Sequence, residues 1–243
     1  MRIVFFVVFV LMVSLVNNAN AEVPVYIAMK AGCPMAMDGI LSEPAWQKAK
    51  SVGPFVFPWY IEGEKEQTEA KVLWDEDRLY FSFKCDDKYI WADRAGTKFR
   101  GDTCEAFISP VPEGKERLDY ANYEISCIGA HLVQFHAKSR DVNYTWREVP
   151  GLVIGRAIDG TGNNDSDIDN GFVVEFSIPF SHFKDFDVTF PPKDGQVIYL
   201  GLNRLGGQTN MQYSQWSASQ TPKPQFHSPP DFGKVIFSTE ELK

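Results

Sequence analysis

The chain has 243 residues, with 24 lysines and arginines against 32 aspartates and glutamates, which gives a formal net charge of −8. Hydrophobic residues make up 44% of it and charged residues 23%, so the chain is too apolar to be disordered. Its pI of about 5.1 argues against the basic surface that nucleic acids or anionic membranes require. Aromatic residues reach 14%, which favours strands over helices.

The first 21 residues have the pattern of a secretory signal peptide. Arg2 precedes an apolar run over residues 3–16, and Ala19-Asn20-Ala21 is a small-x-small cleavage site. We expect cleavage near Ala21 and a mature chain, residues 22–243, that is secreted, periplasmic or on the cell surface. A signal anchor that stays attached is the alternative. No second apolar run is long enough for a membrane span, so none is expected in the mature chain.

The elements predicted along the chain are mostly strands. Ser42 could cap a short helix over residues 43–49. Residues 71–74 and 79–85 alternate apolar and polar side chains around a polar turn, which predicts a hairpin with one buried face. Further strands are expected at 104–109, 122–127, 132–137, 152–158, 172–178, 197–203, 211–217 and 234–237, with a short helix at 181–186.

Neither predicted helix could cross over between parallel strands, because a βαβ connection needs a dozen or more residues. No linker or repeat divides the mature chain. The sequence therefore predicts an all-β fold, an antiparallel β-sandwich of two packed sheets, immunoglobulin-like or jelly-roll-like, with one or two short helices. It forms a single domain over residues 22–243.

Four cysteines lie in the mature chain. An even number in an exported protein permits two disulfides, and the spacings match no zinc pattern. Cys104 and Cys127 lie in consecutive predicted strands and could face each other. The alternative is that some of the four cysteines are buried free thiols. The disulfide candidates are Cys33, Cys85, Cys104 and Cys127.

The loop at residues 165–171 is acidic and imitates a calcium loop. The positions that an EF-hand reserves for Gly and Glu hold Asn170 and Phe176, so it is not an EF-hand. Its aspartates could still ligate calcium in a structural role, but a solvated turn explains them as well. These candidates are Asp165, Asp167 and Asp169. No cofactor is otherwise required, and no metal ligand set is identified.

The sequence carries none of the motifs Gly-x-Gly-x-x-Gly, P-loop, His-Glu-x-x-His or Gly-x-Ser-x-Gly. A glycoside hydrolase needs two carboxylates at a fixed separation. Asp102 and Glu105 lie three apart on one predicted strand and point to opposite faces, which is unsuitable geometry. We therefore expect no catalysis, and any association with glycoside hydrolysis would be as an accessory binding module.

Five stretches of the chain carry a family resemblance in the same order. Residues 101–110 read Gly-Asp-Thr-Cys-Glu-Ala-Phe-Ile-Ser-Pro, and residues 171–180 read Gly-Phe-Val-Val-Glu-Phe-Ser-Ile-Pro-Phe. With 38–46, 72–80 and the segment 213–233, they resemble the family 9 carbohydrate-binding modules and their DOMON-like relatives. The closing segment is similar to a stand-alone secreted branch of that superfamily.

This resemblance implies a sandwich that binds sugar and catalyses nothing. In the family, two aromatic side chains enclose a terminal sugar, and polar side chains hold its hydroxyls. The first aromatic matches Phe99, the second matches Trp216, and the hydroxyl-binding glutamate matches Glu105.

The chemistry of the residues points to the same places. A sugar site needs flat aromatics for the C–H face and fixed polar groups for the hydroxyl rim. Trp216 has polar neighbours, although a core tryptophan is the alternative. Glu105 must be paired or face a ligand, because burial of an unpaired carboxylate is costly. Glu175 and Trp46 are expected to be structural. The candidate ligand-binding residues are Phe99, Arg100, Glu105, Asn203, Arg204, Tyr213 and Trp216.

The sequence therefore predicts a monomer that binds an oligo- or polysaccharide, in support of carbohydrate catabolism, with a free energy of about −4 to −8 kcal/mol. One alternative is a haem-binding DOMON-like sandwich, with Met211 or the methionines at 29, 35 and 37 as iron ligands. Another is a structural surface protein whose sandwich has lost its ligand.

Overall fold

A computed structural model describes residues 22–92, 101–138, 142–146, 148–186 and 188–243. The proposed signal peptide lies outside these residues. The elements, in chain order, are β1 (Val25–Ala31), α1 (Pro44–Lys48), β2 (Thr68–Trp74), β3 (Arg78–Cys85), β4 (Thr103–Ser109), β5 (Asp119–Ser126), β6 (His131–Ala137), β7 (Val142–Trp146), β8 (Val153–Asp159), β9 (Gly171–Pro179), η2 (Phe180–Phe183), β10 (Val197–Leu205), β11 (Tyr213–Gln215), η3 (Pro229–Asp231) and β12 (Gly233–Leu242).

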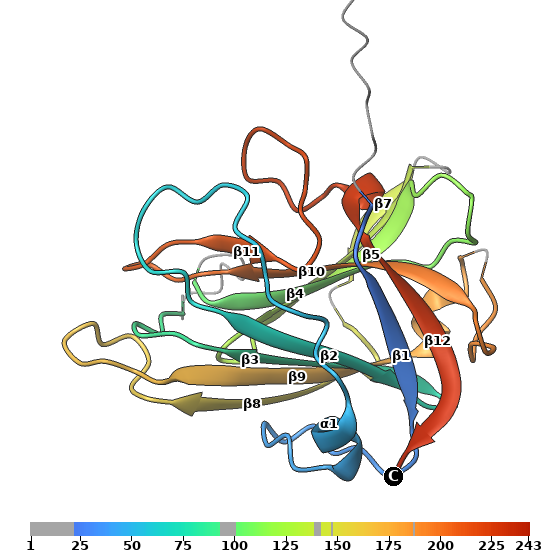
Figure 1. Ribbon diagram of the computed structural model, residues 1–243, viewed down its shortest axis with the longest axis horizontal. Coiled ribbons are helices and arrows are strands. Elements are labelled where there is room, and N and C mark those ends of the chain that lie inside the picture. Colours follow the sequence, from blue (N-terminus) through green and yellow to red (C-terminus); the bar gives the residue numbers. More distant parts are fainter. Residues whose placement is uncertain (1–21, 93–100, 139–141, 147, 187) are drawn as a thin grey trace, which may run out of the picture.

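The described strands form one curled sheet in the order β7-β6-β5-β4-β10-β12-β1-β2-β3-β9-β8, with β11 paired to β10. Figure 1 shows that β4, β10 and β11 lie in one layer and β2, β3, β9 and β8 in the other, while β1 and β12 run between the layers. The strand β1 pairs in parallel with both β12 and β2, and the remaining pairings are antiparallel. The predicted all-β sandwich is confirmed, with this mixed pairing at β1.

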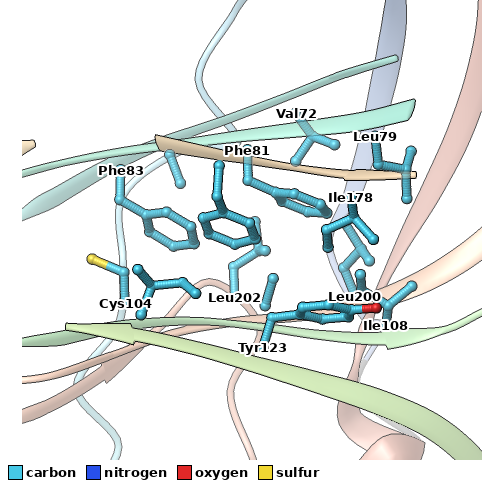
Figure 2. Close-up of a cluster of buried hydrophobic side chains, with 14 of the residues drawn as sticks. Val72, Leu79, Phe81, Phe83, Cys104, Ile108, Tyr123, Ile178, Leu200 and Leu202 are labelled. Carbon is cyan, nitrogen blue, oxygen red and sulfur yellow. The ribbon is translucent and has the colours of Figure 1, made fainter. Parts of the chain in front are cut away.

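The core forms where alternate side chains of the two layers meet. Figure 2 shows Phe81 and Phe83 of β3 facing Tyr123, Leu200 and Leu202 of the other layer. All five are buried, because the period of two places every second side chain on the inner face. The same period places the intervening residues of each strand on the outer face, where a site can form.

The predicted strands are present, although some bounds differ. The segment expected at 211–217 is strand only at β11, and β5 begins earlier than expected. Both short helices are found, the second as the 3₁₀ turn η2. Two strands, β1 and β7, were not predicted. No helix among the described residues is long and apolar enough to cross a membrane.

The segment before α1 is held to β9 by one buried carboxylate. Glu175 accepts hydrogen bonds from the backbone N–H groups of Asp38 and Gly39, at 2.8 and 2.6 Å, and from Trp46 Nε1 at 3.2 Å. Gly39 has a φ of 88°, and a Cβ there would lie 2.4 Å from backbone atoms of Arg156. The expected structural roles of Glu175 and Trp46 are therefore confirmed.

All four cysteines are free thiols. The Sγ atoms of Cys85 and Cys104 lie 3.6 Å apart inside the core, well beyond the length of a disulfide bond. Cys104 therefore contacts Cys85 of the other layer, whereas the sequence suggested Cys127 as its partner. The buried cysteines pack in the core cluster as small apolar side chains.

Candidate functional site

The outer face of β4, β5 and β6 carries polar side chains that are covered rather than solvated. Cys104, Ala106 and Ile108 of β4 face the core, so Glu105 and Phe107 face outward. Glu105 is only 5% exposed, because loops from other parts of the chain lie over this face.

These outward side chains form the floor of a cavity of about 280 Å³, which we name the sheet-face pocket. Its walls come from β11 and from the loop that precedes η3. It is lined by Glu105, Phe107, Glu124, Leu132, Gln134, Tyr213, Pro224, Gln225, Phe226 and His227.

A second cavity of about 470 Å³, the loop pocket, adjoins it and shares Tyr213 and Pro224 with it. The segment between α1 and β2 supplies half of its lining. It is lined by Phe57, Pro58, Trp59, Tyr60, Ile61, Glu62, Met211, Gln212, Tyr213, Pro222, Lys223 and Pro224.

Two carboxyl groups lie side by side on the floor of the sheet-face pocket. Glu105 of β4 is the register partner of Glu124 of β5, and each residue is 5% exposed. Burial and then the neighbouring Glu124 raise the pKa of Glu105 well above its usual range. Burial raises the pKa of Glu124 to about 7. No lysine or arginine is among the described lining residues, so we infer that the pair holds at least one proton near neutral pH.

Amide side chains surround this pair. Asn203 Nδ2 lies 3.5 Å from Glu105 Oε2, and Asn122 Nδ2 donates to Glu124 Oε1 at 2.7 Å. His136 Nε2 lies 2.9 Å from Asn122 Oδ1. Glu124 Oε2 has no hydrogen-bond partner among the described residues, although it is buried. A buried acceptor without a partner in a pocket is available to a ligand donor.

The ionisation of Glu124 gives a prediction about stability. Its pKa is about 7 in the folded protein against an ordinary 4.5, so the folded state binds a proton that the unfolded state releases between these values. Its contribution to stability is therefore complete below about pH 4.5 and is lost as the pH rises through about 7. Relative to Glu124→Gln, we expect the wild type to lose roughly 2–4 kcal/mol of unfolding free energy between pH 4.5 and 8.

Urea unfolding of both proteins at the two pH values measures this difference. The variant Glu113→Gln, at an exposed glutamate, is the control and is expected to follow the wild type. If wild type and Glu124→Gln differed in unfolding free energy by the same amount at both pH values, the result would contradict a raised pKa of Glu124.

An aromatic cluster stands where the two pockets meet. Tyr213 lies at the shared wall, and its ring centroid is 6.5 Å from that of Trp59 and 6.0 Å from that of Phe226. Trp59 and Phe226 are 5.8 Å apart. Trp59 Nε1 donates to the carbonyl of Thr221 at 2.8 Å, which joins the two covering loops. The sequence predicted Tyr213 but neither of the other two rings.

The structure corrects the predicted role of Trp216. This residue is 4% exposed and belongs to the main core, where its ring meets that of Tyr26 edge to face at 6.4 Å. A Cβ at Gly233 would lie 2.4 Å from the indole. A ring enclosed in this way has no face for a sugar, so Trp216 is a packing residue.

The structure also corrects the predicted role of Arg204, which is fully buried on the inner side of β10. Its Nη2 lies 2.7 Å from Asp87 Oδ2, 3.7 Å from Asp102 Oδ1 and 3.8 Å from Glu66 Oε2. The guanidinium is used by this buried ion cluster and does not reach the pocket. Asp102 and Glu105 do lie on opposite sides of the layer, as predicted.

The remaining predicted residues have mixed positions. Glu105, Asn203 and Tyr213 come together at the sheet-face pocket, whereas Phe99 and Arg100 lie outside the described residues. Among the methionines, Met211 is 62% exposed at the loop pocket. Those at positions 29, 35 and 37 pack against the small core around α1.

The acidic loop before β9 is organised by its own hydrogen bonds. Asp169 accepts from the backbone N–H groups of Ile90 and Thr161 at 2.9 and 2.6 Å, and Asp167 accepts from the Thr161 hydroxyl at 2.6 Å. The hydroxyl of Thr209 donates to Asp165. No group of three His, Cys, Asp or Glu side chains among the described residues is arranged to hold a metal ion. Calcium binding at this loop stays a prediction.

Comparisons with known proteins point to one family. The model of a family described as carbohydrate family 9 binding domain-like matches residues 37–240. A candidate carbohydrate-binding protein from Bacteroides uniformis is similar in structure, with a TM-score of 0.66 and 20% identity over 89% of this chain and 100% of that one. No curated protein matches the chain.

A family 9 carbohydrate-binding module from Caldicellulosiruptor kristjanssonii, solved with cellotriose, has a TM-score of 0.61 and 12% identity. The match covers 88% of this chain and 95% of that one. A family 9 module from the same organism, solved with glucose, has a TM-score of 0.58 and 12% identity. At these identities the structural likeness shows a shared fold.

Proposed function

The chain belongs to the carbohydrate family 9 binding domain-like family, and on this premise we propose that its sheet-face pocket binds the sugar unit of an oligo- or polysaccharide. The observation that carries the proposal is the pair of buried carboxyls, Glu105 and Glu124, in a pocket that Tyr213 also lines. Carboxyl groups accept hydrogen bonds from sugar hydroxyls, and a protonated carboxyl also donates one.

The walls of the pocket supply the apolar contact that a sugar ring needs. Phe107, Tyr213 and Phe226 line it together with the amide of Gln134. Aromatic faces pack against the C–H groups of a pyranose, and amides pair with its hydroxyls. Glucose and cellotriose, which are bound by the Caldicellulosiruptor module, are therefore suitable first ligands to test.

The proposed function is non-catalytic. Glycoside hydrolysis requires two carboxyl groups that flank the scissile bond. Glu105 and Glu124 instead lie side by side on the floor of the pocket, at directly opposed positions of two neighbouring strands. We expect the protein to bind glycosides without cleaving them.

The cellular setting belongs to the proposal as well. The pattern of residues 1–21 supports export and a secreted, periplasmic or cell-surface location. We propose a stand-alone, DOMON-like monomer that holds glycans during carbohydrate catabolism and requires no cofactor.

A glycan array tests the proposal, with residues 22–243 as wild type, Tyr213→Ala and Glu105→Ala. We expect wild-type binding to one glycan class and a loss of about 10-fold in each variant, because Tyr213→Ala removes a ring face and Glu105→Ala removes a hydrogen-bonding carboxyl, each of which contributes on the order of 1 kcal/mol. Tyr89→Ala is the control, since Tyr89 is half-buried like Tyr213 but does not line either pocket.

Circular dichroism establishes that each variant is folded. Absence of binding by folded wild-type protein to every glycan on the array, or full binding by folded Tyr213→Ala and Glu105→Ala, would overturn the assignment.

A further inference from the structure

The loop pocket differs in chemistry from the sheet-face pocket. Its lining is mainly aromatic, aliphatic and proline side chains. Three of them are well exposed at its surface, Ile61 at 90%, Met211 at 62% and Tyr60 at 44%. Exposed apolar side chains gathered around a cavity mark a binding surface more often than scattered ones do.

The polar groups of the loop pocket are already occupied within the protein. Tyr60 donates its hydroxyl to the carbonyl of Gly63 at 2.7 Å. Gln212 donates to Glu66 Oε2 at 2.7 Å and accepts from the backbone N–H of Glu66 at 3.1 Å. The indole N–H of Trp59 is bonded to Thr221, as described above. Apart from the exposed Glu62 and Lys223, little remains in this lining to pair with sugar hydroxyls.

The two pockets adjoin, because Tyr213 and Pro224 line both. A sugar in the sheet-face pocket therefore lies next to the loop pocket, and a substituent that reaches beyond Tyr213 would enter it. A flat apolar group suits Trp59, Tyr60 and Met211, since aromatic rings and a thioether pack well against another aromatic ring.

We propose that the ligand is a saccharide that carries an aromatic group, with its sugar ring in the sheet-face pocket and its aromatic group in the loop pocket. This inference rests on the proposed function and deepens it. It assigns the loop pocket, with Ile61 and Met211 at its rim, to recognition of the substituent.

Calorimetric titration of matched ligands tests the inference. The probes are the methyl and 4-nitrophenyl β-glycosides of glucose, galactose, mannose and xylose, together with cellobiose. For the sugar that binds, we expect the 4-nitrophenyl glycoside to bind about 10-fold or more tightly than the methyl glycoside. Relative to the methyl glycoside, cellobiose is expected to show a smaller gain in affinity than the 4-nitrophenyl glycoside.

The double variant Ile61→Ser/Met211→Ser separates the two pockets. Both side chains are exposed, so the fold should be unaffected. We expect the variant to bind the methyl glycoside like the wild type and to lose most of the preference for the 4-nitrophenyl form. Ile168→Ser is the matched control, because Ile168 is 69% exposed and does not line either pocket.

The outcomes are distinguishable. Equal binding of the methyl and 4-nitrophenyl forms would overturn the inference and leave the proposed function standing. A larger gain for cellobiose would also overturn it, in favour of a second sugar unit. A preference that survives in the double variant would remove the assignment to the loop pocket. Binding of no member of the panel would overturn the inference together with the proposed function.

Discussion

Replacement of Arg204 by methionine is expected to lower the free energy of unfolding by about 3–5 kcal/mol, the cost of leaving buried charges without their partner. Asp87, Asp102 and Glu66, each at most 5% exposed, would lose their cation. The methionine would fill the space but could not replace the hydrogen bond to the carbonyl of Asp86 at 2.7 Å. Urea unfolding at pH 7 measures the loss.

The pH dependence identifies the cause. Burial already raises the pKa of Glu66 and of Asp102. Without Arg204 these pKa values rise further, so the folded variant binds protons that the unfolded chain releases, and its deficit shrinks as the pH falls. Arg156→Met, at an exposed arginine, is expected to stay within about 0.5 kcal/mol of the wild type. A deficit that is constant from pH 8 to pH 5 would argue against the loss of charge pairing.

Replacement of Trp216 by alanine is expected to cost about 3–5 kcal/mol of stability, as for other buried tryptophans. The indole fills the core between Tyr26 and Gly233, so its removal leaves a cavity that the surrounding strands cannot close. Glycan affinity per folded molecule should stay within about twofold of the wild type, since this ring lies away from the sheet-face pocket.

Tyr213→Ala is the matched comparison. We expect this variant to bind glycans weakly and to lose little stability, whereas Trp216→Ala loses stability and keeps its glycan affinity. Unfolding curves and titrations of both variants under the same conditions give the result. If folded Trp216→Ala lost glycan binding while Tyr213→Ala kept it, Trp216 and not Tyr213 would belong to the binding site.

Local patterns predicted most of the strands. The alternation over residues 79–85 fixed both the strand and its buried face, and each predicted hairpin strand was found. An alternation of this kind in β10 also indicates that Arg204 is buried. Arg204 lies on the inner face of β10 with Leu200 and Leu202. Its charge suggested a ligand contact, but the period of two placed it inside.

The rest of the site depends on contacts that no local pattern contains. Glu124 joins Glu105 only through the register of β4 and β5, which a connection as long as residues 110–118 does not specify. Trp59 and Phe226 meet at Tyr213 from loops that are far apart in the sequence. Strand β1 was missed because its exposed positions are apolar as well, as at Val25 and Ile27, so the alternation is hidden.

The parallel pairing of β1 with β12 has a consequence for how the molecule is made. These strands stand at opposite ends of the described chain and lie next to each other in the sheet, at the junction of its two layers. Pairing these strands closes a loop of nearly the whole chain, and the entropy of loop closure is lost before the contacts between the strands stabilise the fold. Proteins dominated by such long-range pairings therefore fold in about milliseconds to seconds. The two halves of the sheet cannot be joined until β12, the last strand of the chain to be made, is available to pair. Until then the edges of β10 and β1 stay open to other unpaired strands.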